Sequence, residues 1–322
     1  MNAIYEKLLK GMRKLCGRIP DSIPPFMDAE ESSAAITAVL SSGKPCMIAR
    51  YGSTELNCIV NGLGVQGGAK PLSFIKGRSP QWWWNQQAIF LMQEYSGFFP
   101  LEMEYIDRFC RLMGEDAKEL DLLASWRYQE RFIPSLDSVP KIPLVYLEPW
   151  WSSKPWTAAL EGKRVLVVHP FAEEIRRQYA EVRESLFERP DILPEFSLTV
   201  IPAVQSLGGE KGQYANWFEA LEDMERKMDA VEYDIALIGC GAYGFPLAAH
   251  AKRTGHQAVH MGGALQLLFG IKGRRWEDPQ YGVREWGLPE GYYPQMFNES
   301  WIRPGESVRP RNANQVENAC YW

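Results

Sequence analysis

The sequence is poor in the residues that build metal centres and disulfide frameworks. Its six cysteines show no C-x-x-C spacing, and its four histidines are scattered over positions 169, 250, 256 and 260. These patterns argue against a zinc site and against a disulfide framework. No apolar run reaches the ~18–20 residues of a membrane-spanning helix, and the net charge of -5 argues against sequence-independent nucleic-acid binding. We therefore expect a cytoplasmic protein with reduced thiols that binds no nucleic acid.

Two motifs of common enzyme classes are also missing. The absence of a G-x-x-x-x-G-K-[ST] loop argues against P-loop phosphoryl transfer, and the absence of a G-x-S-x-G elbow argues against the common hydrolase class. The chain is instead rich in hydrophobic residues, which make up 46% of its 322 positions and include twelve tryptophans. This is enough for a large core in one domain or in two closely packed ones.

Residues 1–40 are predicted to form two helices around a turn that contains Pro20, Pro24 and Pro25. The first helix is basic and amphipathic, and it lacks the uninterrupted apolar stretch of a signal peptide. It is either a packing helix or a weak peripheral contact with the anionic inner face of a membrane. The sequence leaves these two interpretations open.

Short apolar segments alternate with helical patterns in the second half of the chain. We predict strands at 164–168, 198–202 and 235–238 and helices near 172–187 and 216–229. An earlier strand, Cys46 to Ala49, precedes a helix for which Ser53 or Thr54 is the expected N-cap. Such alternation predicts an α/β fold with a mostly parallel sheet flanked by helices.

We expect three parts along the chain. An N-terminal helical segment covers 1–40, and an α/β domain covers 41–276. This domain contains a helical insertion at about 62–160, with the strongest helical periodicity at 86–130. A C-terminal tail, 277–322, is expected to wrap the body as ordered coil because it has many Pro, Gly and Trp residues and few periodic signals.

Two glycine-rich turns follow successive strands near the end of the predicted domain. Gly239, Gly241 and Gly244 follow the strand at 235–238, and Gly262-Gly263 follow the next strand. Backbone N–H groups in such turns can approach a phosphate without obstruction from a Cβ atom. The first turn matches G-x-G-x-x-G, but His260 stands where a dinucleotide site needs an acidic residue. The turns therefore indicate a nucleotide ligand and argue against a nicotinamide or flavin cofactor.

Polar residues follow the other predicted strands. Arg50 could hold a diphosphate, and Glu55 could bind a divalent cation or accept a proton. The alternatives are a contact of Glu55 with the helix dipole and an ion pair between the two residues. His169 could contact phosphate or act in acid–base chemistry, or it could be a core histidine.

Two further groups of polar residues belong to the candidate site. One is a loop with amide and hydroxyl groups suited to a sugar or a uracil edge, made of Gln205, Ser206, Gly208 and Gly209. The other is a cationic cluster of Lys272, Arg274 and Arg275, which suits an anionic ligand. An ordinary turn and a solvated helix end are the respective alternatives.

Two segments of the chain resemble the GT-D-type glycosyltransferases. Arg50-Tyr51-Gly52-Ser53-Thr54-Glu55-Leu56 resembles the R-[FY]-G-D-G-E element after that family's first strand. Residues 241–248, which include Tyr243, and residues 255–263 resemble its closing strand–turn–helix unit. The similarity covers roughly 44–60 and 160–276. It implies a Rossmann-like fold, a nucleotide-sugar donor, and an acidic D-x-E element that assists a divalent metal at the diphosphate.

The resemblance assigns roles to residues of this chain. Arg50 matches the family's arginine and Glu55 its second acid, which implies a metal ligand for Mn²⁺ or Mg²⁺. The first acid falls on Ser53, which carries no charge and would make a poorer metal site. The family's aspartate before the last glycine falls on His260. Glu55 is thus the first choice as catalytic residue, followed by His169 and His260.

The expected function is transfer of a sugar from a nucleoside-diphosphate donor to a glycan or a glycosylated carrier, in the synthesis of a surface polysaccharide or a glycoprotein. Another nucleotide-using enzyme, such as a dehydrogenase or methyltransferase, remains an alternative. So does a catalytically silent homologue that binds glycan. Homo-oligomerisation is left open.

Overall fold

The computed structural model describes residues 3–17, 23, 26–206, 212–305 and 320–322. The described residues form an α/β fold around one seven-stranded sheet, and every strand pairing in it is parallel. The strand order is β3-β2-β1-β7-β6-β4-β5. The strands are β1 (Cys46–Ala49), β2 (Leu122–Ser125), β3 (Lys141–Pro143), β4 (Arg164–His169), β5 (Ser197–Pro202), β6 (Ile235–Ile238) and β7 (Gln257–His260).

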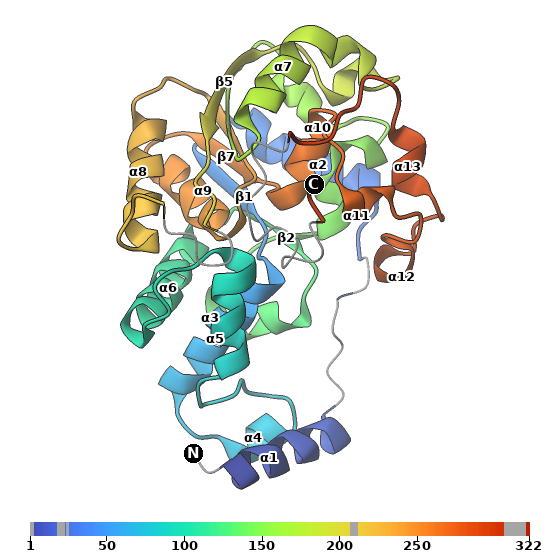
Figure 1. Cartoon of the computed structure of the whole chain (residues 1–322). Helices are drawn as coiled ribbons and strands as arrows, with labels where there is room; N and C mark the ends of the chain where they lie inside the picture. Colours follow the sequence, from blue (N-terminus) through green and yellow to red (C-terminus); the bar gives the residue numbers. More distant parts are fainter. Residues whose placement is uncertain (1–2, 18–22, 24–25, 207–211, 306–319) are drawn as a thin grey trace.

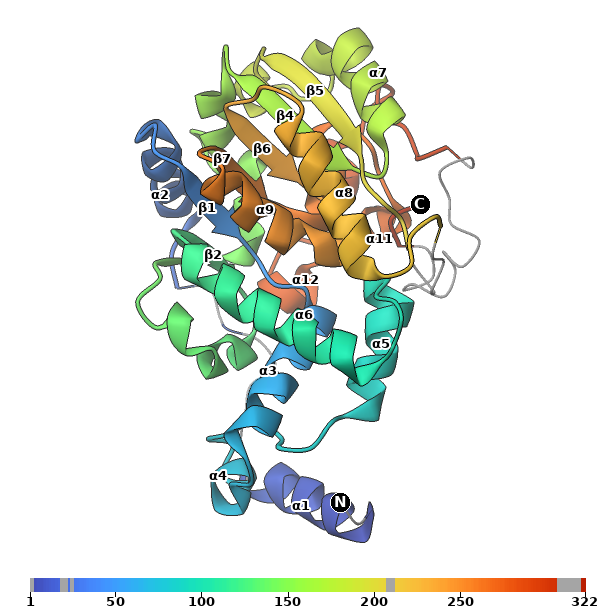
Figure 2. The same cartoon turned by 90° about the vertical axis from the view of Figure 1, so that its left-hand side faces the viewer.

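Helices cover both faces of the sheet (Figures 1 and 2). One face packs against α3, α5, α6, α8 and α9, and the other packs against α2, α7, α10 and the C-terminal segment. The described helices are α1 (Ala3–Cys16), α2 (Ala29–Ser41), α3 (Ser53–Gly67), α4 (Pro71–Ile75), α5 (Gln86–Ser96), α6 (Met103–Asp116), α7 (Ala172–Val182), α8 (Trp217–Asp229), α9 (Gly244–Arg253), α10 (Leu265–Leu268), α11 (Arg274–Glu277), α12 (Val283–Trp286) and α13 (Tyr292–Met296).

The central strands are apolar throughout because both of their faces are covered. All four residues of β1 are buried; Met47 and Ala49 belong to one core, and Cys46 and Ile48 belong to the other. Alternate side chains of a strand point to opposite faces of the sheet. A short apolar strand therefore supplies side chains to the cores on both faces. The predicted α/β fold with a parallel sheet is therefore confirmed.

Helices α5 and α6 lie in the region 86–130, where the strongest helical periodicity was expected, but the expected helical insertion also contains strands. Leu122–Ser125 forms strand β2, and Lys141–Pro143 forms β3 at the edge of the sheet. The segment described as a helical insertion therefore supplies part of the sheet. In addition, α3 begins at Ser53 with Gly52 as its N-cap, so neither Ser53 nor Thr54 caps it. The predicted turn residues Pro20, Pro24 and Pro25 lie outside the described residues.

The C-terminal segment contains short helices as well as coil. Helices α11 to α13 contribute side chains to the same core as α10 and α2, and the C-terminus lies beside α11 (Figure 1). Tyr293, Trp301 and Trp322 are buried in the second core. The described part of the tail thus covers one face of the sheet, as a wrapping tail would.

After β4 the chain passes to one face of the sheet, and after β6 it passes to the opposite face. Helix α7, which follows β4, packs into one core through Ile175, while α9, which follows β6, packs into the other through Leu247. β4 and β6 are neighbours, so the departing chains diverge at their carboxyl ends. In open α/β sheets such a divergence opens the crevice in which ligands bind.

Candidate functional site

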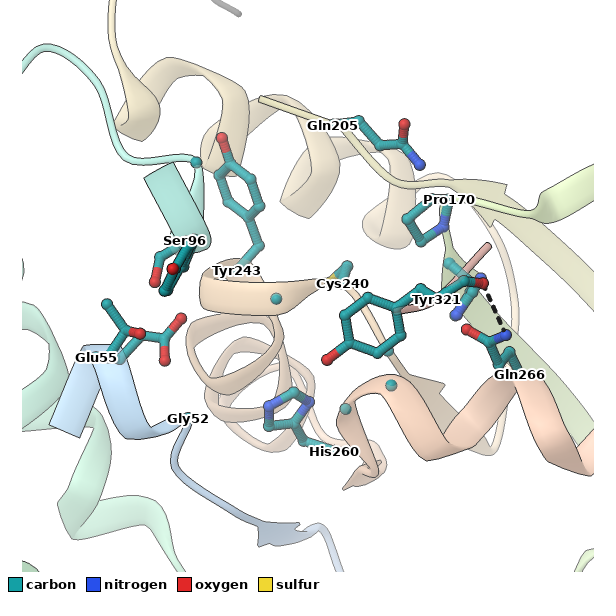
Figure 3. Close-up of a pocket in the computed structure, with 18 of the residues that line it drawn as sticks. Gly52, Glu55, Ser96, Pro170, Gln205, Cys240, Tyr243, His260, Gln266 and Tyr321 are labelled. Atoms are coloured by element: carbon teal, nitrogen blue, oxygen red, sulfur yellow. Dashed lines mark hydrogen bonds between the residues drawn. The ribbon is translucent and has the colours of Figure 1, made fainter. Parts of the chain in front are cut away.

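A cavity of about 220 Å³ opens at the carboxyl ends of the central strands (Figure 3). Strands β1, β4, β6 and β7 all end at this cavity. Most of the residues that the sequence indicated line it: Arg50, Gly52, Ser53, Glu55, His169, Gln205, Ser206, Gly239, Gly241, Tyr243, His260, Gly262, Gly263 and Arg275. Residues from several separate parts of the chain therefore meet at one site.

The two glycine turns lie directly against each other at the floor of the cavity. A Cβ atom on Gly239 would stand 2.7 Å from the carbonyl oxygen of Gly262 and 2.9 Å from Cδ2 of His169. No real side chain fits at such distances, so glycine at 239 allows the ends of β4, β6 and β7 to converge. Gly262 has a φ of 64°, a conformation that glycine adopts without strain. Backbone atoms thus form much of this surface.

Arg50 lies at the end of β1 between this turn and an aromatic ring. Its guanidinium carbon is 5.5 Å from the ring centroid of Trp126, and its Nε has no hydrogen-bond partner among the described residues. Burial lowers the pKa of Arg50, while the nearby Tyr321 and Glu55 oppose that shift. Arginine stays cationic in proteins at neutral pH. Arg50 therefore brings a partly buried positive charge, with a buried Nε that has unused donor capacity, to the cavity.

Glu55 lies in the first turn of α3, and its carboxylate folds back over the start of the helix. A Cβ atom on Gly52 would lie 1.8 Å from Oε2 of Glu55, so glycine at 52 leaves room for the carboxylate. Negative charge is favourable at a helix N-terminus. In the view of Figure 3, Glu55 and Ser96 lie on one side of the cavity and Tyr321 on the other, with His260 between them.

The described residues do not fit a divalent cation. Glu55 has the one carboxylate side chain among the described residues that line the cavity, and no group of three or more His, Cys, Asp or Glu side chains there could hold a metal ion. Mg²⁺ and Mn²⁺ prefer several oxygen ligands. Ser53 supplies a hydroxyl in place of a second carboxylate, and the charge of Arg50 is close by.

Both histidines of the site are buried and neutral. Burial lowers the pKa of His169 to about 3, and burial together with the charge of Arg50 lowers the pKa of His260 to about 3. Nδ1 of His169 accepts a hydrogen bond from the backbone N–H of Phe171 at 3.0 Å. Nδ1 of His260 lies 3.1 Å from the carbonyl oxygen of Ile238 and therefore carries the proton. As neutral imidazoles, both rings can form hydrogen bonds, but they are poor proton acceptors near pH 7.

Ser206 and Tyr243 use their hydroxyl groups to hold the cavity wall together. Oγ of Ser206 donates to the carbonyl oxygen of Gly97 at 2.6 Å and lies 3.0 Å from the hydroxyl of Tyr243. The Tyr243 ring stacks on Trp217 at 4.7 Å. Gln205 stands at the rim near Pro170 (Figure 3). Gly208 and Gly209, which the sequence placed in the same loop, lie outside the described residues.

Three predicted ligand-binding residues do not line the cavity. Gly244 packs against His260, because a Cβ atom on it would lie 2.2 Å from Cε1 of that ring. Lys272 has its ammonium 3.8 Å from the carboxylate of Glu277. Arg274 is exposed, and its backbone N–H donates to the carbonyl oxygen of Trp322. Of the predicted cationic cluster, Arg275 alone reaches the site.

Tyr321 was not predicted to belong to the site, although it lies against the second glycine turn. A Cβ atom on Gly263 would lie 2.2 Å from Cε1 of Tyr321. Arg275 stacks over the Tyr321 ring with its guanidinium carbon 4.7 Å from the centroid, and its Nη1 donates to the hydroxyl at 3.3 Å. Gln266 donates to the Tyr321 carbonyl oxygen (Figure 3).

Trp126 was also not predicted to line the cavity. It follows β2, the strand that the sequence analysis did not find, and its Nε1 donates to the carbonyl oxygen of Tyr51 at 3.0 Å. The indole is thereby fixed beside Arg50. Recognising β2 in the sequence would have brought Trp126 to the same edge of the sheet.

Comparisons of the chain with protein-family models, with curated protein sequences and with solved structures gave no match. The described lining residues carry two arginines, Arg50 and Arg275, against the single carboxylate side chain of Glu55. In a chain of net charge -5, this is a locally positive cavity. It suits an anionic ligand of small or moderate size.

Proposed function

We propose that this protein is a glycosyltransferase that binds a nucleoside-diphosphate sugar in the cavity and transfers its sugar to a hydroxyl group of a glycan or glycosylated carrier. The observation that carries the proposal is the convergence of two glycine turns with Arg50 and Arg275 in one cavity. The family resemblance of the segments around Arg50 and Gly262 points to the same substrate class.

The proposed binding mode follows from the charge of the diphosphate. The backbone N–H of Gly239 donates to the carbonyl oxygen of Val168. The N–H groups that follow it in the first glycine turn, those of the turn at Gly262 and those of the first turn of α3 present positive dipole ends. Arg50 and Arg275 add two formal charges within the cavity. When the bond to the sugar breaks, negative charge grows on the leaving diphosphate. Fixed donors that are already in place stabilise that charge and so lower the barrier.

The acceptor hydroxyl loses a proton during transfer, and Glu55 is the group proposed to receive it. The acceptor oxygen bonds to the anomeric carbon of the sugar as the bond from that carbon to the diphosphate breaks. The diphosphate leaves with the electron pair. A carboxylate held near the reacting atoms can speed such a step by about 10²–10⁴-fold. The neutral rings of His169 and His260 are proposed to form hydrogen bonds with the nucleotide sugar.

The proposed ligand class can be tested by thermal unfolding with a panel of UDP-sugars, GDP-sugars, CMP-sialic acid, NAD(H) and S-adenosylmethionine, each with and without Mn²⁺. A ligand present at 100 times its Kd stabilises the fold by about 2.7 kcal/mol. We expect a UDP-sugar or a GDP-sugar to raise the Tm with little dependence on Mn²⁺, and CMP-sialic acid, which carries a single phosphate, serves as the control. A rise with NAD(H) or S-adenosylmethionine alone would contradict the proposal and favour one of the other nucleotide-using classes.

No described helix is both long and apolar enough to cross a membrane. Helix α1 nevertheless exposes an apolar face at the end of the molecule farthest from the sheet (Figures 1 and 2). Leu8 is 58% exposed and Leu15 87% exposed, whereas Leu9 is buried against α4. Lys7 and Lys14 are exposed beside this face. An apolar stripe next to lysines suits an anionic lipid surface, so the proposed function includes peripheral attachment through α1.

Replacing Leu8 and Leu15 together by serine is expected to weaken binding to vesicles that contain about one third anionic lipid by at least ~10-fold. Burial of one leucine side chain contributes about 1.5–3 kcal/mol. Co-sedimentation measures the bound fraction, and Phe90→Ser, at another half-exposed apolar side chain, serves as the control. Equal binding by the double variant and the wild type would remove α1 as the attachment site.

A further inference from the structure

A second cavity, of about 120 Å³, lies next to the first and is not used by the function proposed above. The two cavities share a set of lining residues: Arg50, Trp126, Gly263, Arg275 and Tyr321. The shared residues include both arginines of the site and part of the second glycine turn. The positive groups therefore lie at the boundary between two spaces.

The walls of the second cavity differ in chemistry from those of the first. Aromatic side chains of the C-terminal segment contribute Trp276, Tyr281 and Trp286, and Glu148 contributes a carboxyl group. Flat aromatic faces pack well against the C–H face of a sugar ring. A carboxyl group among them can bind the hydroxyls at the edge of such a ring. This combination suits a neutral, hydroxyl-bearing ring.

Glu148 is held in one orientation by two donors. Nε1 of Trp151 lies 3.0 Å from its Oε2, and the hydroxyl of Tyr293 lies 2.8 Å from the same oxygen. Burial raises the pKa of Glu148 to about 7. Near neutral pH the group is therefore protonated in part of the molecules, and it can then donate as well as accept a hydrogen bond. Sugar hydroxyls need partners of both kinds.

The order of these environments matches the order of groups in a nucleotide sugar. Such a donor consists of a nucleoside, then a diphosphate, then a sugar ring. The first cavity is lined by Gln205 and the first glycine turn, and Arg50 and Arg275 stand at its boundary with the second cavity. Beyond that boundary lies the aromatic cavity with Glu148.

Building on the proposed function, we propose that the second cavity is the subsite for the donor's sugar and that Glu148 binds the hydroxyls of a neutral sugar ring. The nucleoside then occupies the part of the first cavity that is lined by Gln205 and the first glycine turn, and the diphosphate lies against Arg50, Arg275 and the turn at Gly263. The anomeric carbon lies at the boundary beside Arg50, where the charge of Glu55 acts from the first cavity. Tyr321 stands at this boundary, where Arg275 donates to its hydroxyl. The Tyr321 side chain must turn aside for a donor to span both cavities.

The subsite is tested by calorimetry on the full chain with two matched ligand pairs, UDP against UDP-glucose and GDP against GDP-mannose. We expect Glu148→Gln and Trp286→Ala each to weaken binding of the nucleotide sugar by at least ~10-fold. Binding of the matching nucleoside diphosphate should change by less than about twofold. In Glu148→Gln the new amide oxygen can still accept from Trp151 and Tyr293, so this variant is expected to unfold at the wild-type temperature.

Each other outcome has a defined meaning. If the variants weaken binding of the nucleotide sugar and of its nucleoside diphosphate equally, or weaken neither, the sugar subsite is overturned and the proposed function stands. Failure of the wild type to bind any of the four probes contradicts the proposed function and the subsite with it. Glu161→Gln alters an exposed carboxylate and should change neither affinity. Trp286→Ala provides an independent answer should Glu148→Gln lose stability.

Discussion

Glu55→Gln is expected to lower the rate of sugar transfer by at least ~100-fold while the protein keeps its fold and its affinity for the nucleoside diphosphate. The amide has nearly the same shape as the carboxylate but cannot take up a proton from the acceptor hydroxyl, and loss of a catalytic base typically costs about 10²–10⁴-fold in rate. The measurement is steady-state turnover with the nucleotide sugar that gives the largest thermal shift.

A matched control for this variant is Glu102→Gln, which changes an exposed carboxylate just before α6 and should keep wild-type turnover. Glu55 also lies in the first turn of α3, where a negative charge contributes about 0.3–1 kcal/mol of stability. Thermal unfolding should therefore show a small loss at most. Near-full activity of Glu55→Gln would remove this residue from the chemistry and return attention to the other polar groups of the cavity.

Arg50→Met is expected to weaken binding of the nucleoside diphosphate by about 10–100-fold. A hydrogen bond between charged groups contributes about 1.5–3 kcal/mol, and each 1.4 kcal/mol corresponds to about a tenfold change in Kd. Binding of the free nucleoside, which carries no phosphate, should change little. Calorimetric titration with UDP and uridine, and with GDP and guanosine, separates these two expectations.

Arg50→Lys is the companion variant, because it keeps the positive charge and loses the planar fork of donors. It should bind the diphosphate with intermediate affinity. The methionine variant leaves Glu55 without a neighbouring positive charge, so its thermal unfolding must be measured alongside. Equal losses for nucleoside and nucleoside diphosphate would show that Arg50 shapes the cavity without contacting the phosphates.

Much of the sheet could be predicted from the sequence because its strands are short apolar runs bounded by polar residues and glycine. The segments at 46–49, 164–168, 198–202 and 235–238 all form strands at or within one residue of the expected bounds. In contrast, β2 follows a helical stretch and contains an alanine and a serine among its four residues. A local pattern of that kind does not distinguish a buried strand from the end of a helix.

The candidate site was predictable wherever a candidate residue stands at the end of a strand or just after it. Arg50, His169, Gly239 and Gly262 all stand at carboxyl ends of strands, and a parallel sheet brings those ends to one edge. Lys272 and Arg274 were expected at the site because they are close to Arg275 in the sequence. Lys272 instead lies before α11 with its ammonium beside Glu277, and Arg274 is exposed at the first position of that helix. Burial lowers the pKa of His169 and of His260. The sequence could not show this, because burial depends on which other parts of the chain cover the two rings.

The sequence by itself determined that this chain folds as helices around a parallel sheet and that glycine turns and polar residues gather at the carboxyl edge. Both follow from patterns a few residues long. Tertiary structure alone decided that Tyr321 lies on Gly263, that Trp126 stands beside Arg50, and that Glu148 borders a second cavity next to the first. These contacts join residues that are far apart in the chain. They exist because the order of strands in the sheet, and the packing of the C-terminal segment over it, bring them together.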